Sequence, residues 1–376
     1  MDKEKVTGIV SNILWTVMLV ATLVYGLVSG HWRAFIFLAG LFVISKGVLL
    51  LGHLKLRKET IRLENELASQ GRSTVVPEPQ AIAAMQEKTA RISEEIERVR
   101  PPKDCLRFAI APAATPSIYD SKLGGLPYWD TAKPYPTDAT GKPMAMVMQV
   151  NLDKSKRLPY GGMLQFFITS DAEVLAEGYG ADYDDPTSQR NFRVVYHENI
   201  DYHLDSASVQ AYPTIETQEN TPVFGEYALT EDAAKSHIHN TDGSFETLFA
   251  DAVRRLFGDE MKEEEWPEEY LSRELPEEQR WPNVDEALVV GDTPLWDDPD
   301  RRFQLLGYPA FIQEDPREKD SPFDTLLLQI PTIGNGEGEQ PWQSLWGDCG
   351  AAYLFINSSD LQNRDFSHVH YEVQCY

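Results

Sequence analysis

Two histidine pairs are the side chains best placed for metal chemistry. His237 and His239 lie in SHIH, and His368 and His370 lie in HVH. Residues i and i+2 of a strand share a face, so either pair could offer two imidazoles to one ion. The carboxylates that could complete such a site are Asp348, Asp360 and Asp365. Because isolated histidines in loops or half-buried strands are far commoner, we predict no metal site.

One cysteine has neighbours that could support nucleophilic chemistry. Cys349 lies in WGDCG beside Asp348, and His368 or His370 could supply a base after folding. The favoured interpretation is a small thiol in a tight turn, where the flanking glycines supply backbone freedom. The chain contains no P-loop, GxGxxG, HExxH or GxSxG motif. We therefore expect no catalytic residue and no cofactor, although missing motifs do not exclude an enzyme.

Two glutamines interrupt otherwise apolar strand patterns. Gln149 lies in MVMQVNL and Gln329 in LLLQIPT, and a buried amide must find hydrogen-bond partners. Each could hold a neighbouring loop, or the two could meet across a pseudo-two-fold axis and line a ligand cleft. The candidate cleft residues are Tyr128, Gln149, Tyr308, Gln329, Trp346, Asp348 and His368.

An acidic segment offers a different kind of site. Residues 259–300 hold 16 acidic and 3 basic side chains, with three tryptophans among them. They form either a solvated surface or an acidic, aromatic docking face for a protein partner. The candidate docking residues are Glu263, Glu264, Glu265, Trp266, Glu268 and Glu269.

The distribution of charge limits the partners. The net charge is −25, and residues 101–376 alone, with 21 basic and 49 acidic side chains, carry −28. Such a region repels phosphate backbones, so we expect no nucleic-acid partner. The negative charge favours either a basic protein partner or simply solubility. Three cysteines, none in a CxxC pair, are typical of a reducing compartment.

Two apolar runs precede the acidic region. Gly8 to Gly30 contains no charged residue, and as a helix it would span roughly 34 Å, more than a hydrocarbon core of about 30 Å. Ala34 to Gly52 is interrupted only by Lys46. We predict a transmembrane hairpin over residues 1–53. Basic residues flank both ends, which predicts a multi-pass plasma-membrane protein with its soluble domain in the cytoplasm.

The remaining elements should position the candidate sites. Residues 54–102 read as a helical stalk, in which an apolar stripe from Ile82 to Val99 packs on the following domain or on a second chain. Residues 103–376 read as one strand-rich α+β domain with a helical, acidic insertion at about 231–300. GGLPYW, MVMQVNL and GGMLQFFIT recur in order as LLGYPAF, LLLQIPT and CGAAYLFIN, which indicates two related sheet halves.

The same segments carry a family resemblance. They include SKLGGLPYWDTAKPYP, GKPMAMVMQVNL, LPYGGMLQFF, LLGYPAFIQEDPR, LLLQI, WGDCGAAYLFI and DLQNRDFSHVHYEVQCY, spread from Ser121 to Tyr376. The chain resembles the YwqG-like family, bacterial domains of unknown function. The resemblance implies a compact α+β domain rich in antiparallel strands and supplies no catalytic mechanism. Members occur near secreted-toxin gene clusters, which suggests an immunity role.

Two function classes follow from these patterns. The leading hypothesis is a membrane-anchored cytoplasmic protein-binding module, immunity-like in one form and without catalysis. The alternative is a small-ligand binder or enzyme with a cleft between the two sheet halves. A deep pocket with converging polar groups would favour the second class, whereas a filled interface between the halves would leave it without a site.

Overall fold

The computed structural model describes residues 79–112, 115–155, 158–262, 265–273, 275, 302–334 and 341–376. All ten strands of these residues form one antiparallel sheet with the order β10-β9-β8-β7-β1-β6-β2-β3-β4-β5. The first half contributes β1 (Lys103–Ile110), β2 (Lys122–Leu123), β3 (Ala145–Asn151), β4 (Met163–Ile168) and β5 (Phe192–His197). The second contributes β6 (Tyr227–Ser236), β7 (Gln304–Leu305), β8 (Thr325–Pro331), β9 (Ala351–Ile356) and β10 (Val369–Gln374).

The predicted internal repeat is present in the strand pairing. Lys122 of β2 pairs with Gln149, and Gln304 of β7 pairs with Gln329. Each half has a bulge at the same place in its third strand, after Met146 in β3 and after Leu326 in β8. The first strands are exchanged, because β6 pairs with β2 of the first half and β1 pairs with β7 of the second.

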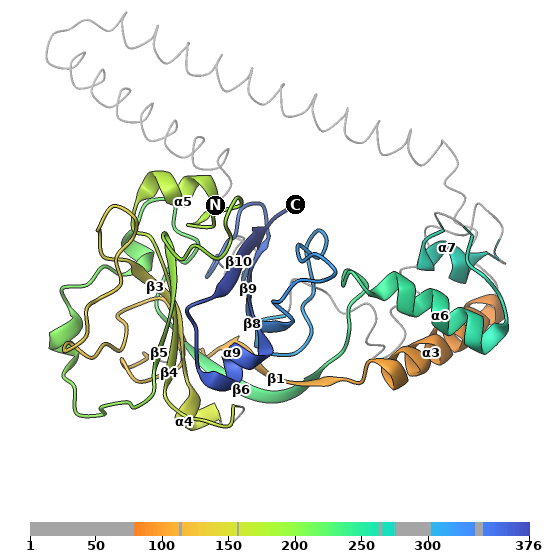
Figure 1. Ribbon diagram of the computed structural model, residues 1–376, viewed down its shortest axis with the longest axis horizontal. Helices are drawn as coiled ribbons and strands as arrows, with labels where there is room; N and C mark the ends of the chain where they lie inside the picture. Colours follow the sequence, from red (N-terminus) through yellow and green to blue (C-terminus); the bar gives the residue numbers. More distant parts are fainter. Residues whose placement is uncertain are drawn as a thin grey trace, which may run out of the picture. The chain divides into compact units, whose positions relative to one another are not determined.

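The bulges decide which side chains enter the core. A bulge inserts one extra residue, so two neighbours can point to the same face. Val147 with Met148, and Leu327 with Leu328, all lie in the central hydrophobic cluster. The sheet folds over so that β3, β4 and β5 face β8, β9 and β10 across this cluster (Figure 1). The two glutamines that follow the bulges are thereby turned to the outer faces of the two layers.

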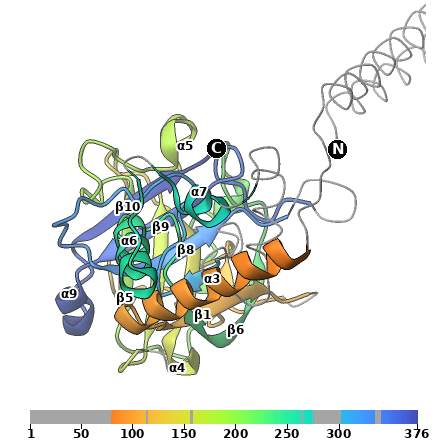
Figure 2. The same ribbon diagram turned by 90° about the vertical axis from the view of Figure 1, so that its right-hand side faces the viewer.

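Three helices form a second, smaller core. They are α3 (Pro79–Val99), α6 (Phe245–Phe257) and α7 (Pro267–Ser272), and α3 lies along α6 and α7 in both views (Figure 1, Figure 2). Ile92 and Ile96 of α3 are buried against Phe249 and Val253 of α6. The stripe therefore packs on the following domain, as one of the two alternatives predicted. The buried residues of the stripe, Ile92 and Ile96 among them, are therefore not available as a face for a second chain, whereas Val99 at its end is 40% exposed.

The remaining helices are short and connect strands. They are α4 (Leu152–Ser155), α5 (Ala172–Gly178), the 3-10 helices η1 (Ser206–Val209) and η2 (Ile215–Thr217), and α9 (Ser358–Asn363). The helical insertion begins later than predicted, because residues up to Ser236 belong to β6. That stretch contains good helix formers, but it pairs with β1 along the whole of β1. Tertiary pairing overrides the local helix preference there.

The predicted membrane hairpin, and with it the predicted membrane partner, transmembrane character and membrane localisation, must be corrected. No helix in the described part of the chain is long and apolar enough to cross a bilayer. The longest, α3, carries seven charged side chains and buries a single stripe. Residues 1–53, where we placed the hairpin, and residues 54–78 of the stalk lie outside the described residues. The fold that the structure shows is a folded antiparallel sheet with short helices.

Candidate functional site

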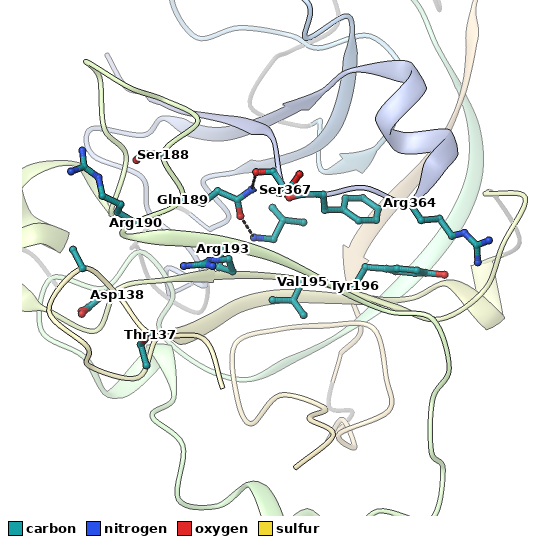
Figure 3. Close-up of a pocket in the computed structure, with 13 residues that line it drawn as sticks. Thr137, Asp138, Ser188, Gln189, Arg190, Arg193, Val195, Tyr196, Arg364 and Ser367 are labelled. Carbon is teal, nitrogen blue, oxygen red and sulfur yellow. Dashed lines mark hydrogen bonds between the residues drawn. The ribbon is translucent and has the colours of Figure 1, made fainter. Parts of the chain in front are cut away.

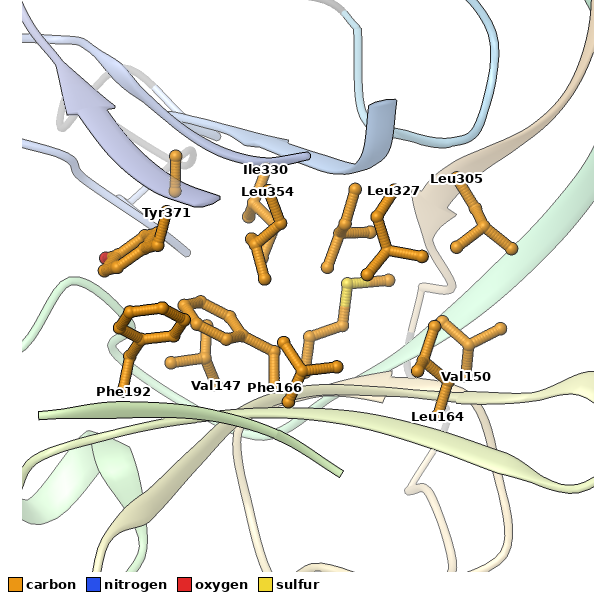
Figure 4. Packing of buried hydrophobic residues seen from close by; sticks show 14 of the residues in the cluster. Val147, Val150, Leu164, Phe166, Phe192, Leu305, Leu327, Ile330, Leu354 and Tyr371 are labelled. Carbon is orange, nitrogen blue, oxygen red and sulfur yellow. The ribbon is translucent and has the colours of Figure 1, made fainter. Parts of the chain in front are cut away.

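The space between the two layers is filled. Leucine, valine, methionine and phenylalanine side chains from both halves meet there, with Tyr371 among them (Figure 4). Trp346 belongs to the same buried cluster. Among the described residues, a cavity lined by β3, β4, β5, β8 and β9 has a volume of about 10 Å³. That is about the space of one water molecule. The described residues thus leave no cleft between the sheet halves for a substrate.

Gln149 and Gln329 lie in these opposite layers, and each holds the loop outside its own strand. Gln149 Oε1 accepts from Tyr128 N–H at 2.9 Å, and its Nε2 donates to the carbonyls of Ile118 and Asp120. Gln329 Oε1 accepts from Ala310 N–H at 3.1 Å. Both amides are fully buried. The loop-holding interpretation is confirmed, and the two glutamines do not meet.

The other cleft candidates lie in separate environments. Tyr128 is buried on the outside of β3 and accepts from Asp201 N–H at 2.9 Å. Tyr308 belongs to the helical core, and its hydroxyl donates to the Pro101 carbonyl. Trp346 is in the central core. Asp348 and His368 are exposed on the surface. Because the five residues lie in these different environments, they do not converge on a common ligand.

The histidine and cysteine patterns also do not assemble into a site. His237 Nδ1 lies 2.9 Å from Glu97 of α3, whereas His239 Nδ1 bonds Thr241 at 2.7 Å. Cys349 has a positive φ of 58°, in the turn before β9. Across the described residues, no group of three His, Cys, Asp or Glu side chains is arranged to hold a metal ion.

The acidic docking candidates are partly used inside their own segment. Glu265 forms an ion pair with Arg273, whose hydrogen bond lowers the pKa of this carboxyl. Glu269 accepts from Trp266 N–H at 3.3 Å and caps α7. Trp266 is 60% exposed, as a docking residue requires. Glu263 and Glu264 lie outside the described residues, and Glu268 is half-buried in α7.

A groove with a volume of about 720 Å³ runs along the outer edge of β5, and we call it the edge groove. Residues 193–196 of β5 and residues 188–190 of the preceding loop line it (Figure 3). One wall comes from the loop before β3 and the other from the turn between α9 and β10. The lining residues are Thr137, Asp138, Ala139, Ser188, Gln189, Arg190, Arg193, Val194, Val195, Tyr196, Arg364, Phe366 and Ser367.

The charge of the edge groove is opposite to that of the whole chain. Three arginines line it, although the net charge is −25. Arg190 pairs with Asp182 at 2.8 Å, and Arg364 pairs with Glu198. Arg193 has no hydrogen-bond or ion-pair partner among the described residues, and its Nε is buried. The side chain as a whole is half-buried and lines the edge groove, so the rest of the guanidinium can receive an anion with charge-assisted hydrogen bonds.

The one carboxylate in the lining is committed to its own loop. Asp138 Oδ1 accepts from Thr140 N–H and Oγ1 and from Lys142 N–H, and Oδ2 accepts from Thr169 Oγ1. Burial raises the pKa of Asp138, but these hydrogen bonds outweigh it and hold the pKa below its usual value. Asp138 is therefore ionised and shapes the wall, and it forms no ion pair with Arg193.

The backbone of β5 presents polar groups to the edge groove. Thr169 N–H donates to the Asn191 carbonyl at 2.8 Å, in register with the β4–β5 ladder. Antiparallel pairs alternate between bonded and non-bonded, so the amides and carbonyls of Phe192, Val194 and Tyr196 point away from β4. An edge strand of this kind can pair with another strand.

Gln189 joins this edge to the other half of the sheet. Its Oε1 accepts from Val194 N–H at 3.1 Å, and its Nε2 donates to the carbonyls of Phe366 and Ser367 at 2.8 and 3.0 Å. The equivalent amide of β10, that of Tyr371, donates to the Pro186 carbonyl at 2.9 Å. The loop before β5 thus bonds part of the free edges of both β5 and β10. The carbonyl of Val194 and the amide of Tyr196 have no hydrogen-bond partner among the described residues and face the groove.

Sequence analysis did not find the edge groove. Arg190 precedes the strand segment FRVVYH and Arg193 is its second residue, but sequence analysis gave neither arginine a role. Arg364 and Ser367 come from the chain about 170 residues later, and no motif links the two segments. The signal in the sequence was the presence of arginines in a strongly acidic region, which composition alone cannot place on a surface.

Comparison with known proteins gives one family match. A family model described as Domain of unknown function (DUF1963) matches residues 121–375. This range contains β2 to β10 and every residue that lines the edge groove, and it begins after α3 and β1. No curated protein matches the chain.

Proposed function

The chain belongs to the family described as Domain of unknown function (DUF1963). From this premise we propose that it is a YwqG-like protein-binding module without catalysis. In this proposal the edge groove holds an extended segment of a partner protein. The observation that carries this proposal is a groove of about 720 Å³ beside an edge strand whose outward backbone groups are in part unbonded by the described residues. Peptide segments bind in this way by adding a strand to an exposed sheet edge.

The lining supports binding better than bond-breaking chemistry. It offers arginine, serine, threonine, glutamine and apolar side chains, and its one aspartate is fully hydrogen-bonded. The hydroxyl of its one tyrosine, Tyr196, donates to the Gly161 carbonyl at 2.7 Å. A general base must reach a proton on the substrate, and a nucleophile needs a base beside it. Ser367 Oγ bonds Asp365 at 2.5 Å and His368 Nδ1 at 3.0 Å, but Asp365 and His368 are exposed and do not line the groove.

The alternative function, a ligand site between the sheet halves, receives no support from the packing. Apolar side chains fill that space, and the polar candidates lie on outer faces or in separate cores. A substrate there would have to displace the main core of the domain, at a cost of several kcal/mol for each large side chain moved.

Photo-crosslinking on the full chain tests the proposal. A benzophenone amino acid replaces Ala139, which lines the edge groove, and in a control it replaces Ala132 in the same connecting loop. Both alanines are exposed, so neither replacement disturbs the core. We expect one partner segment to be cross-linked in native extract from position 139 and not from position 132. Equal labelling from both positions, or none from either, would contradict the proposal.

A further inference from the structure

We infer that the partner segment is acidic and adds to β5 as an extra strand, with a carboxylate against Arg193. This inference rests on the proposed function and specifies the partner. It replaces the basic partner that the net charge of −25 had favoured, because the local charge of the edge groove is positive. It follows from three features of the edge groove: an uncompensated guanidinium, open backbone groups and the alternation of side chains along β5.

The first feature is the state of Arg193. Its Nε is buried without a partner, and no carboxylate of the described residues lies within ion-pair distance. The neighbouring Asp138 is saturated by its own loop. A guanidinium presents a planar fork that matches a carboxylate with two parallel hydrogen bonds. An incoming Glu or Asp side chain would satisfy Arg193, whereas a Lys or Arg would leave two cations together.

The second feature is the edge itself. The carbonyl of Val194 and the amide and carbonyl of Tyr196 point away from β4, and no described residue bonds them. The Val194 amide alone is closed, by Gln189. Two or three backbone hydrogen bonds are thus available to an extended chain, as in strand addition. A compact anion such as phosphate would use Arg193 but not this row of backbone groups.

The third feature sets the spacing of the partner's side chains. Arg193 and Val195 lie two residues apart on β5, so they share the outer face of the sheet. Both line the groove (Figure 3). Side chains of an added strand on that face are also two residues apart, and directly opposite pairs contact each other. The partner segment should therefore carry a carboxylate and an apolar side chain separated by one residue.

Fluorescence polarisation with short peptides tests this on the full chain. The probes are seven-residue labelled peptides, Ser-Thr-Glu-Thr-Val-Thr-Ser and the version with Glu and Val exchanged, because the strand direction sets their order. Matched peptides carry Gln or Lys in place of Glu. We expect one Glu peptide to bind at least tenfold more tightly than its Gln match and more tightly still than its Lys match. Equal affinities for the three peptides, or no binding by any, would overturn the inference.

Variants of the chain locate the charge. In Arg193→Gln the preference for Glu over Gln should fall to within twofold, and Arg193→Lys should keep part of it, because the charge remains and the fork is lost. Arg254→Gln is the matched control, because Arg254 is exposed on α6 and its replacement removes the same charge. Thermal melting of each variant verifies folding. An unchanged preference in Arg193→Gln contradicts the assignment.

Methylated peptides separate strand addition from simple charge capture. N-methylation of alternate amides blocks the hydrogen bonds of one edge of the peptide. One set of methylated amides should weaken binding at least tenfold, and the complementary set should change it by less than threefold. If both sets bind like the parent peptide, strand addition is wrong. If a position-139 cross-link identifies a segment without Glu or Asp, the acidic assignment fails while the protein-binding function stands.

Discussion

The side-chain Oε1 of Gln189 accepts a hydrogen bond from the backbone N–H of Val194 at 3.1 Å, at the outer edge of β5. The same amide group reaches across to the carbonyls of Phe366 and Ser367 from the opposite half of the sheet. One side chain thus occupies part of a free strand edge and ties the two layers together. Natural sheets commonly protect their edges, and here the protection stops short of Tyr196.

Replacement of Gln189 by Ala should loosen this junction. The change leaves one buried N–H and two carbonyls without partners, so we expect a loss of about 1 to 3 kcal/mol in the free energy of unfolding. Amide exchange at Val194 should become faster in the same variant. Denaturant unfolding and hydrogen exchange measure the two effects. Gln210→Ala, at an exposed glutamine, should change neither; a Gln189 variant as stable as this control would argue against the bridge.

The two repeated glutamines should differ in their contribution to stability. Removing the Gln149 amide takes away the hydrogen bonds that it makes to Tyr128 N–H and to the carbonyls of Ile118 and Asp120. Gln149→Ala should therefore lower the free energy of unfolding by about 2 to 4 kcal/mol. Gln329→Ala should cost less, because the Ala310 carbonyl keeps its bond from Tyr353 Oη at 3.0 Å. Guanidinium unfolding of both variants gives the order, and a larger loss at position 329 would contradict this account.

The stability of the domain should depend on pH through His197. This imidazole is buried on the outside of β5, its Nε2 donates to Gln165 at 3.0 Å, and burial lowers its pKa from 6.5 to about 4. Between pH 6.5 and 4.5 the unfolded chain binds a proton that the folded chain rejects. Stability is therefore complete above pH 6.5 and falls by about 2 to 3 kcal/mol as the pH drops to 4.5.

Unfolding of His197→Gln over the same range provides the comparison. This variant should lose the His197 part of the pH slope, whereas His203→Gln, at an exposed histidine, should keep the slope of the parent chain. Parallel curves for the His197 variant and the parent would show that His197 is not held neutral.

The helix α3 should behave as part of the folded domain. Ile92 is fully buried against α6, so Ile92→Ala should cost about 2 to 4 kcal/mol through lost burial and a cavity. Val99 lies on the same helix but is 40% exposed, and Val99→Ala should change stability by less than about 0.5 kcal/mol. Denaturant unfolding separates the two variants. A small effect at Ile92 would mean that α3 is not packed in solution.

Sequence patterns gave correct predictions where the predicted feature depends on a single helix or strand. The apolar stripe of α3 and the alternating runs around Gln149 and Gln329 correctly indicated a packed helix and two repeated strands, because side-chain periodicity follows from local backbone geometry. The membrane hairpin was a different case. A membrane span requires a long apolar helix, and no helix in the described part of the chain meets that requirement. The apolar residues of α3, α6 and α7 are buried in a protein core.

The sequence by itself therefore determined the repeated strands and the amphipathic helix, since side-chain periodicity depends on residues close together in the chain. It left open whether the two glutamines hold loops or meet, because their backbone partners lie 19 to 31 residues away. Only the tertiary structure decided that the space between the two halves of the sheet is a packed core. It also placed the edge groove beside β5. The exchange of β1 and β6 folds the two halves face to face, and this brings Gln189 against Phe366. Contacts across such a distance in the chain carry no local pattern, because they depend on how the whole sheet closes.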